Sequence, residues 1–350
     1  MKTLNEFPPR KHPKIELFNQ NRCVTQKTFS KDLLNLDCAS EVEKICGMLR
    51  QEVLRNLKKK GIVLGLSGGI DSSTVAALAA RALGPNRVLA LLMPEKDSSV
   101  ETLELSRAVV EHLGIKSIHE DISPILEAVG CYRRRDEAIR LILPEYGPGW
   151  KSKLILPSVV DGQNLRIFSI VARSPDGKQI TRSLNLEAYL GIIAATNFKQ
   201  RTRKMLEYYH ADRLNYAVAG TPNRLEYDQG FFVKLGDGAA DVKPIAHLYK
   251  TQVYQIAQYL GVPAAIINRP PTTDTYSLPQ TQEEFYFCLP YETMDLVLYA
   301  KSNGFNSSEI AEQLALQPEQ VDRVFRDIDA KRRVAKYLHS PAALAEEIKN

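Results

Sequence analysis

The sequence predicts an α/β fold, a doubly wound parallel sheet with flanking helices. Short apolar runs at 62–66 and 88–93 alternate with amphipathic stretches at 71–83 and 100–113. Apolar runs of this length are typical of buried strands, and the stretches between them repeat apolar residues at helical spacing. Strands and helices that alternate in this way form βαβ units, in which ligands bind at the carboxyl ends of the parallel strands.

The other elements follow from the same local patterns. Ser40 and Glu43 match a capping box, which predicts a helix over 40–60. In chain order, the further expected elements are a strand at 116–119, a long helix at 186–210, a strand at 214–219 and a helix within 244–260 that stops at Gly261. The expected organisation is an irregular proline-containing arm at 1–39, one domain at 40–338 and a tail at 339–350.

A segment at about 123–186 interrupts the alternation of strands and helices. Two extended runs, 165–173 and 178–184, flank Ser174-Pro175-Asp176-Gly177, which is a strong turn signal. We therefore expect a β-hairpin inserted into the α/β domain. The charged run 132–137 is interpreted as a solvated face. An oligomer contact, a partner docking surface and a lid all stay open as roles of this insertion.

Composition points to a cytoplasmic protein that acts on a small anionic substrate. A net charge of +5 over 350 residues suits a nucleotide but is too small and dispersed to argue for nucleic acid. The five cysteines include no C-x-x-C and the six histidines form no ligand-spaced pair, which argues for reduced thiols and against zinc. No stretch approaches the ~20 apolar residues of a membrane span, and the N-terminus has no signal-peptide core.

A stretch at 306–321 matches a helix-turn-helix by pattern. Two short amphipathic helices joined by a turn give the same pattern. The second helix would open with Pro318-Glu319-Gln320 rather than with base-reading Arg or Asn. We therefore expect two packed helices here and no nucleic-acid partner.

The loop between the first strand and the first helix is the most informative stretch. It contains Ser67-Gly68-Gly69-Ile70-Asp71-Ser72-Ser73 and opens a helix, where backbone N–H groups cradle anions. Its glycines let the main chain approach a phosphate, and Asp71 is suited to hold Mg²⁺ against phosphate oxygens. The loop lacks the lysine of a Walker sequence. An ordinary Gly-Ser turn is the alternative, but the strand before the loop and the helix after it favour phosphate binding. The loop at 94–99 is expected at the same edge of the sheet.

The loop is similar to the PP-loop of the N-type ATP pyrophosphatases, and further stretches resemble the NAD synthetase family, of the ammonia-dependent type. These stretches are 92–99, Gly220-Thr221 with Glu226, 234–253, 270–272 and 280–283. They lie in the family's order over roughly 40–120 and 185–335, which is far more specific than one loop. The resemblance implies an adenine nucleotide α-hydrolase-like fold. It also implies ATP-dependent amidation of nicotinic acid adenine dinucleotide (deamido-NAD): an acyl-adenylate forms, pyrophosphate leaves, and ammonia displaces AMP.

The resemblance also implies roles for particular residues. The implied catalytic residues are Asp71, Asp237 and Lys250, and the implied Mg²⁺ ligands are Asp71 and Glu226. The implied ATP contacts are Ser67, Gly68, Gly69, Ser72, Ser73, Met93, Thr221, Lys250 and Thr272. The implied dinucleotide contacts are Asn197, Arg201, Arg203, Lys234, Asp237, Asp241, Lys331 and Arg332. For Asp237 and Lys250 the alternative is a surface ion pair.

Three features depart from the family's pattern. Gln282 stands where the family usually has an aspartate, and Ala330-Lys331-Arg332 stands where it usually has His-Lys-Arg. The third departure is the insertion at 123–186, which is longer than in the compact ammonia-dependent enzymes. The resemblance implies that the first two lie in segments that close over the dinucleotide.

The nitrogen source and the assembly are expectations from the same resemblance. The segment before the loop is too short for the glutaminase domain of glutamine-dependent relatives, so ammonia is expected from solution or from a separate glutaminase. A homodimer is expected, with the helix at 186–210 at its interface. Its apolar residues at helical spacing, which would form a buried stripe, are Leu190, Ile193, Ala194 and Phe198.

Three other functions stay open. The same ATP chemistry could amidate a different carboxylate. A nucleic-acid-modifying PP-loop enzyme is a second alternative, although the cysteine clusters or basic domains often found in such enzymes are not visible. A catalytically silent interaction protein is the third, and the presence of Asp71, Glu226, Asp237 and Lys250 argues against it.

Overall fold

The computed structural model describes residues 28–160, 167–271, 275–287, 289–346 and 348. Its centre is a four-stranded sheet with the strand order β3-β2-β1-β7. The strands are β1 (Ile62–Gly65), β2 (Val88–Leu92), β3 (Lys116–His119) and β7 (Ala217–Val218), and all three pairings are parallel. The predicted parallel α/β sheet is confirmed.

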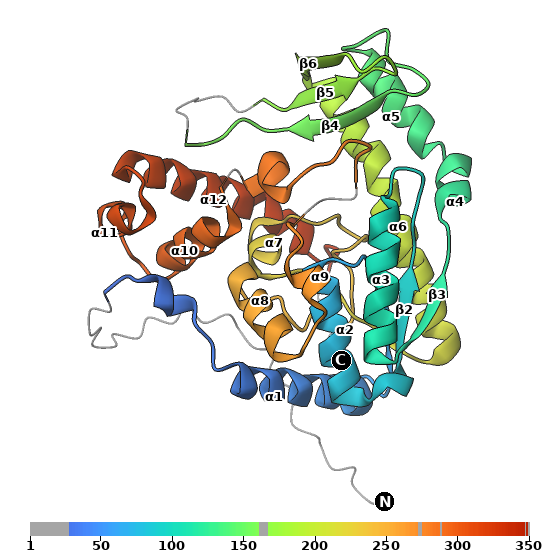
Figure 1. Cartoon of the computed structure of the whole chain (residues 1–350), viewed down its shortest axis with the longest axis vertical. Helices are drawn as coiled ribbons and strands as arrows, with labels where there is room; N and C mark the ends of the chain where they lie inside the picture. The colour runs from blue at the N-terminus through green and yellow to red at the C-terminus, as the bar shows by residue number, and fades with distance from the viewer. Residues whose placement is uncertain (1–27, 161–166, 272–274, 288, 347, 349–350) are drawn as a thin grey trace, which may run out of the picture.

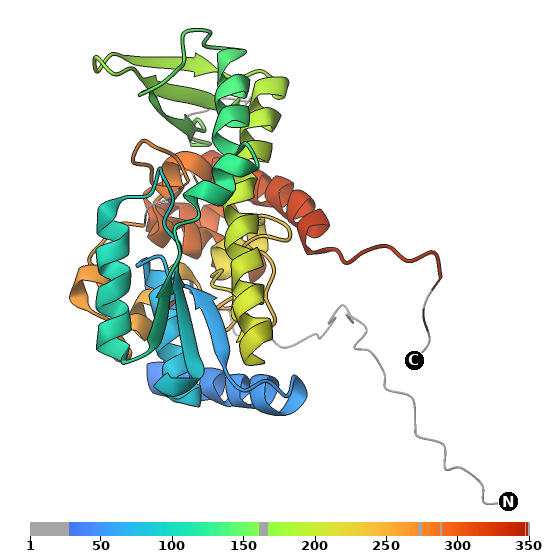
Figure 2. The same ribbon diagram turned by 90° about the vertical axis from the view of Figure 1, so that its right-hand side faces the viewer.

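Both faces of this sheet are covered by helices. Alternate strand residues point to opposite sides, so Ile62 and Leu64 of β1 pack with helices α1, α2 and α8, whereas Val63 packs with α4, α5 and α6. Figure 1 shows α2 and α3 beside the sheet, and Figure 2 shows the long helix α6 running along it on another side. Burial on both faces explains why β1 and β2 are continuous apolar runs, whereas the edge strand β3 is polar and mostly exposed.

The helices have the following bounds: α1 Cys38–Leu49, α2 Ile70–Leu83, α3 Val100–Leu113, α4 Ser123–Ala128, α5 Cys131–Arg140, α6 Leu186–Leu214, α7 Arg224–Gln229, α8 Lys250–Tyr259, α9 Ala264–Ile267, α10 Tyr291–Ser302, α11 Ser307–Ala311 and α12 Pro318–His339. The 3₁₀-helices are η1 Lys31–Leu34, η3 Pro85–Arg87 and η5 Glu312–Leu314, and the π-helices are η2 Arg50–Asn56 and η4 Glu283–Phe287.

Helix ends follow the local signals with two exceptions. Gly84 and Gly114, both with positive φ, end α2 and α3 as expected. The predicted capping box at Ser40 is wrong, because α1 begins two residues earlier and the Asp37 side chain accepts the Ser40 N–H. The strand expected at 214–219 is reduced to β7, because α6 continues to Leu214.

The insertion contains more structure than the predicted hairpin. Strands β5 (Ser169–Arg173) and β6 (Gln179–Ser183) form that hairpin, which is confirmed, but β4 (Lys151–Ile155) pairs with β5 to make a three-stranded antiparallel sheet. Helices α4 and α5 precede it, and the sheet lies over one end of α6 (Figures 1 and 2). The prediction of a solvated face at 132–137 is wrong in part, because Tyr132 and Arg135 are buried where α5 packs on α6.

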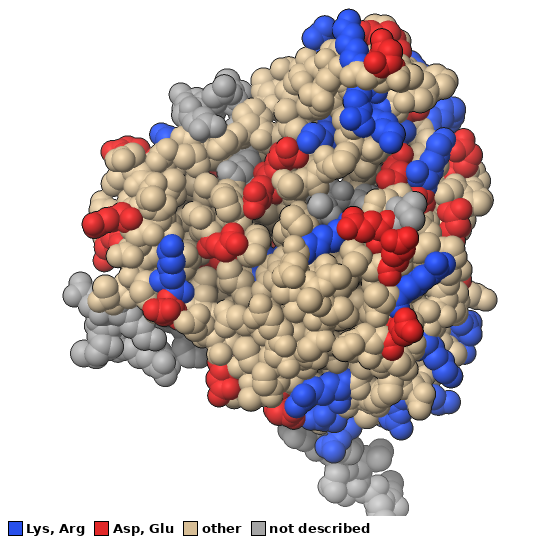
Figure 3. Space-filling view, viewed as in Figure 1, with Lys and Arg blue, Asp and Glu red and all other residues tan. Residues whose placement is uncertain are grey.

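Helices α10, α11 and α12 form a helical lobe that packs on α7 and α8 (Figure 1). The helices expected at 306–338 are confirmed, but the second is long, and its Val324 and Ile328 pack in a core with Met294 and Val297 of α10. On the face in Figure 3, Lys and Arg side chains are interspersed with Asp and Glu rather than gathered into one basic surface. Among the described residues, no helix is long and apolar enough to cross a membrane.

Candidate active site

A cavity of about 450 Å³ opens where β1, β2 and β7 end. The loops after these three strands line it, together with α6, the start of α8 and the segments 266–271 and 275–286. The expectation that the loops at 67–72 and 94–99 meet at one edge of the sheet agrees with this geometry. The predicted site residues that line the cavity are Ser67, Gly69, Asp71, Ser72, Met93, Asn197, Arg203, Thr221, Glu226, Asp237 and Lys250.

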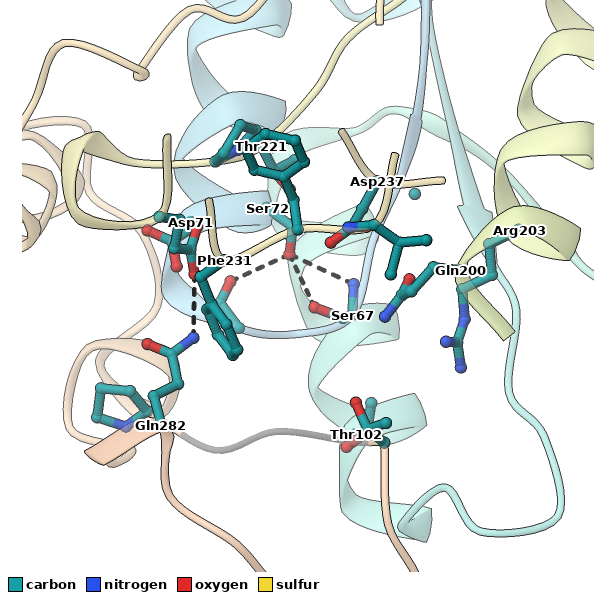
Figure 4. A pocket seen from close by; sticks show the side chains of 18 of the residues that line it. Ser67, Asp71, Ser72, Thr102, Gln200, Arg203, Thr221, Phe231, Asp237 and Gln282 are labelled. Atoms are coloured by element: carbon teal, nitrogen blue, oxygen red, sulfur yellow. Dashed lines mark hydrogen bonds between the residues drawn. The ribbon is translucent and has the colours of Figure 1, made fainter. Parts of the chain in front are cut away.

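The loop after β1, residues 67–72, is the predicted phosphate loop. Its own serine hydroxyls hold it in shape. Ser72 Oγ lies 3.2 Å from Ser67 Oγ, donates to Gly69 O at 3.2 Å and accepts from Ser67 N at 3.3 Å (Figure 4). These contacts bend the chain around the N-terminus of α2, which is a favourable place for a phosphate. The structure thus presents a preformed anion cradle.

Two predicted ATP contacts in this loop do not face the cavity. Gly68 has φ +66°, and a Cβ there would lie 2.9 Å from Leu105 Cβ and 3.0 Å from Ser106 N, so this glycine lets the loop pack on α3. Ser73 is fully buried within α2. By contrast, a Cβ on Gly69 would meet only Ser67 Oγ, at 3.4 Å. Of the two glycines, Gly69 is the one beside the cavity.

Asp71 is joined to Lys250 across the cavity wall. The Lys250 ammonium forms an ion pair with Asp71, and Asn223 Nδ2 donates to the other Asp71 oxygen at 3.2 Å. Lys250 is 1% exposed, which excludes the alternative of a surface ion pair for this residue. Burial opposes its charge, but Asp71 and Glu226 outweigh that effect and raise the pKa of Lys250. This lysine is therefore a fixed positive charge beside the phosphate loop.

Helix α8 presents Lys250 from a braced N-terminus. Asp295 of α10 accepts the N–H of Lys250 at 3.2 Å and of Thr251 at 2.7 Å. The side chain is fully buried, and burial raises the pKa of Asp295 to about 7 despite these bonds. Sequence reasoning missed this contact because 45 residues separate Asp295 from Lys250.

Glu226 completes a pair of carboxylates with Asp71. It lies in the first turn of α7, where Asn223 accepts the Glu226 N–H and the Glu226 carboxylate accepts the Asn223 N–H, each at 3.2 Å. Desolvation, followed by the negative charge of Asp71, raises the pKa of Glu226 to about 8. Gln282 Nε2 donates to Glu226 Oε1 at 3.1 Å. The residue that departs from the family's pattern therefore touches a proposed metal ligand.

The donor set of this pair fits Mg²⁺. Two carboxylates line one cavity beside an anion cradle. Burial, and after it the negative charge of Asp71, raises the pKa of Glu226, and a bound cation would offset that repulsion. Mg²⁺ is commonly held by one or two carboxylates together with phosphate oxygens and water. Among the described residues, no group of three or more His, Cys, Asp or Glu could hold a metal by itself, so phosphate oxygens would have to supply the remaining ligands.

A second charged group also lines the cavity. Lys204 and Glu207, one helical turn apart on α6, form an ion pair at 2.6 Å, and both side chains are buried. Asp237 accepts the N–H of Val233 at 2.8 Å, and burial raises the pKa of both Asp237 and Glu207. Lys204 and Glu207 were not predicted; their spacing on the expected helix was the only sequence signal.

Other predicted substrate residues lie outside the cavity of a single chain. These residues are Arg201, Lys234, Asp241, Lys331 and Arg332. Asp241 accepts the N–H of Val218 at 2.7 Å, and the Arg332 guanidinium donates two hydrogen bonds to the Asp228 carboxylate. Their dinucleotide contacts stay predictions. Thr272 lies outside the described residues.

A buried lysine links the loop after β2 to the far wall of the cavity. Lys199 Nζ contacts Glu95 Oε1 at 2.7 Å, Asp97 Oδ2 at 2.8 Å and the Thr275 carbonyl at 2.8 Å. From α5 in the insertion, Tyr132 donates to Glu95 at 2.8 Å and Arg135 pairs with Asp97 at 2.7 Å. The insertion is thereby joined to the loop that carries Met93 and Ser98 into the cavity.

Comparisons with known proteins agree with this geometry. A family model described as NAD synthase matches residues 41–141 and 168–335. The chain is 56% identical over 330 residues to an NH(3)-dependent NAD(+) synthetase of Rhizobium meliloti, covering 94% of this chain and 97% of the relative. It is 58% identical over 316 residues to that of Mesorhizobium japonicum, covering 90% and 99%.

Solved structures share the fold. An NMN synthetase from Francisella tularensis aligns with a TM-score of 0.63 at 22% identity, covering 89% of this chain and all of that one. An NH3-dependent NAD synthetase from Campylobacter jejuni aligns with a TM-score of 0.58 at 23% identity, covering 89% and 100%. The sequence matches, over the segments that build the cavity, show that the chain belongs to the NAD synthase family.

Proposed function

We propose that this chain is an ammonia-dependent NAD synthetase, a ligase that amidates deamido-NAD with ATP and releases AMP and pyrophosphate. The observation that carries the proposal is the convergence of Asp71, Glu226 and Lys250 on the phosphate loop in one cavity. The family membership and the high identity to enzymes of this name support it. The site lies at the carboxyl edge of the sheet, where α/β folds bind nucleotides.

In the first half-reaction, a carboxylate oxygen of the substrate attacks the α-phosphorus of ATP. The bond to the β-phosphate oxygen breaks, and the loop Ser67–Ser72 holds the leaving pyrophosphate through N–H and hydroxyl donors. Lys250 neutralises negative charge that moves onto the phosphate oxygens. Asp71 and Glu226 would hold Mg²⁺, which when bound offsets phosphate charge.

In the second half-reaction, ammonia attacks the carbonyl carbon of the acyl-adenylate. The new C–N bond forms, one proton leaves the nitrogen, and AMP departs with the electrons of the broken C–O bond. The proposed steps require no enzyme nucleophile, so the chain contributes position and electrostatics. Ammonia comes from solution or from a separate glutaminase partner.

One incubation tests this proposal. The protein is mixed with ATP, Mg²⁺, ammonium and deamido-NAD, and AMP and NAD are quantified by chromatography; equal amounts of the two products are expected. Glutamine in place of ammonium should yield no NAD. Nicotinic acid mononucleotide is the competing carboxylate. AMP formation with nicotinic acid mononucleotide but not with deamido-NAD would instead assign this chain to a different amidation.

We further propose a homodimer that uses α6. The predicted stripe is split by the fold: Ile193 and Phe198 pack against the chain's own core, whereas Leu190 and Ala194 are exposed. Leu186, Met205 and Tyr209 are further exposed apolar residues along the same helix. Such a line of apolar residues on one helix suits a two-fold contact between copies. In the proposed dimer, residues that lie outside one chain's cavity gain access to the dinucleotide.

The proposed location is the cytoplasm. The described cysteines Cys38, Cys46 and Cys131 are free thiols, and burial raises the pKa of Cys131 to about 11. Buried thiols with a raised pKa, such as those of Cys46 and Cys131, suit a reducing compartment.

A further inference from the structure

The family model leaves residues 142–167 unmatched, and this stretch contains β4. One edge of β4 pairs with β5. The other edge contacts the segment 277–284: Ser152 O accepts the Leu278 N–H at 3.2 Å, and the Leu156 N–H donates to Glu284 O at 3.0 Å. The unmatched stretch therefore adds a strand between the hairpin and a segment of the main domain.

Side chains strengthen the second edge of β4. Ser152 N donates to Ser277 Oγ at 2.9 Å, and Lys153 forms an ion pair with Glu284 at 2.9 Å. The amide of the buried Gln280 donates to the Leu154 carbonyl. With backbone and side-chain bonds along its length, the segment 277–284 is fixed to the insertion.

The segment fixed by β4 is part of the cavity wall. Gln282 of this segment lines the cavity and reaches Glu226, and the residues that flank the segment, Tyr276, Phe285 and Tyr286, line it too. The placement of segment 277–284 therefore shapes the part of the cavity that Gln282 and these flanking rings line. Figure 4 shows Gln282 and the loop residues facing the same space.

The hairpin also contributes an aromatic ring to the cavity. Phe168, immediately before β5, lines the cavity and stacks on Tyr189 of α6, with ring centroids 4.6 Å apart and planes 18° apart. Phe285 meets Phe168 at 6.0 Å and Tyr276 at 5.6 Å. These four residues, Phe168, Tyr189, Tyr276 and Phe285, form an aromatic wall with the polar side chain of Asn197 also lining the cavity.

We propose that the insertion builds a ring-binding subsite, in which this aromatic wall holds a planar heteroaromatic ring of the dinucleotide substrate. Aromatic faces stack on flat rings in an offset or edge-on manner, and β4 keeps the wall in place by fixing the segment 277–284. The inference rests on the proposed function, because it takes deamido-NAD as the ligand. In this role the insertion is a fixed part of the substrate site.

The test is calorimetric titration of the full-length protein with deamido-NAD and, separately, with ATP. Phe168→Leu keeps an apolar side chain but removes the ring. It should weaken deamido-NAD binding about threefold to tenfold and leave ATP binding within about twofold. Phe305→Leu is the matched control, because Phe305 also packs on a ring, that of Phe29, but in a core outside the cavity. Unchanged dinucleotide affinity in folded Phe168→Leu overturns the subsite.

A second variant and two fragments complete the design. Gln280→Leu removes the side-chain bond to β4 and should produce the same selective loss of dinucleotide affinity; equal loss for ATP would contradict a local effect. If Phe168→Leu weakens the binding of nicotinic acid mononucleotide, the pyridine ring is the one that contacts the aromatic wall. If only the affinity for the dinucleotide falls, the adenine ring is the one that contacts it. If the wild-type protein binds ATP but no deamido-NAD, the proposed function itself fails. That outcome differs from wild-type binding that Phe168→Leu leaves unchanged.

Discussion

Replacement of Lys199 by methionine tests the buried network that links the loop after β2 to Thr275 in the cavity wall. The Lys199 side chain is 1% exposed, and its ammonium contacts two carboxylates and one carbonyl. Lys199→Met therefore leaves these acceptors without their shared donor. Glu95 is completely buried and Asp97 nearly so. Removing one partner from a buried ion pair costs about 3–5 kcal/mol. Tyr132 still donates to Glu95 and Arg135 to Asp97, so we expect the lower end, about 3 kcal/mol.

The assay is urea unfolding followed by circular dichroism at neutral pH. Lys44→Met is the matched control, because Lys44 has a side chain 68% exposed and pairs only with Glu41 at 3.0 Å among the contacts described for it. Exposed pairs of this kind contribute about 0–1 kcal/mol, so the control should unfold close to wild type. A loss below about 1 kcal/mol for Lys199→Met, equal to that of the control, would refute the reasoning.

Acid unfolding gives a second readout of the same network. Burial alone would raise the pKa of Asp97, but Lys199 and Arg135 outweigh it and lower that pKa. The stability that Asp97 contributes is therefore present above its unfolded pKa of about 3.9 and is lost as the pH falls through the lower folded value. Without Lys199 the folded pKa rises, so the acid transition should move to higher pH. An acid transition at the wild-type pH would contradict this assignment.

The remaining predictions concern the loop, the metal pair, the base of α8 and the dimer. Gly68→Ala should lower the free energy of unfolding in urea by about 1–3 kcal/mol, because φ at Gly68 is positive and the new Cβ meets α3. Gly69→Ala should keep the fold and weaken ATP binding in calorimetry. Equal stability of the two variants would contradict the geometry. Asp71→Asn should slow AMP formation about a hundredfold or more while circular dichroism stays native, and near-normal turnover would remove Asp71 from the mechanism. Because burial raises the folded pKa of Asp295 to about 7, its contribution to stability is lost as the pH rises through that value. Asp295→Asn should therefore gain stability relative to wild type between about pH 4, near the unfolded pKa, and about pH 7 in urea titrations, and a difference that does not vary with pH would count against this. Leu190→Glu should convert a dimer to a monomer in light scattering at micromolar concentration and reduce dinucleotide binding but not ATP binding; a fully active wild-type monomer would end the dimer proposal.

Local chemistry made the central part of the fold predictable. Helix α2 ends at Gly84 and α3 at Gly114, because a glycine with positive φ terminates a helix regardless of what packs on it. The phosphate loop was predictable for the same reason, since the hydrogen-bonding groups of Ser67, Gly69 and Ser72 that shape it lie within six residues of one another. The capping box at Ser40 does not form because Asp37, three residues earlier, caps the helix instead.

The electrostatic environment of the site could not be predicted to the same degree. Asp71 and Lys250 are 179 residues apart, and their pairing depends on α2 and α8 packing side by side. Glu226 and Gln282 are 56 residues apart, so the sequence showed Gln282 as a departure without showing what it touches. Arg135 lies in a charged run that is solvated in most proteins, but here burial follows from α5 packing against α6.

The sequence by itself determined the βαβ order, the phosphate loop and the family, because each depends on residues that are neighbours along the chain. Tertiary structure decided which carboxylates face one another, which charges lose water and what the insertion does. Strand β4 shows the reason: it has no distinct local signature, and its partner Ser277 is 125 residues from Ser152. Pairing over such distances is selected by the free energy of the whole packed chain, in which burial and hydrogen bonding must offset the entropy of closing long loops.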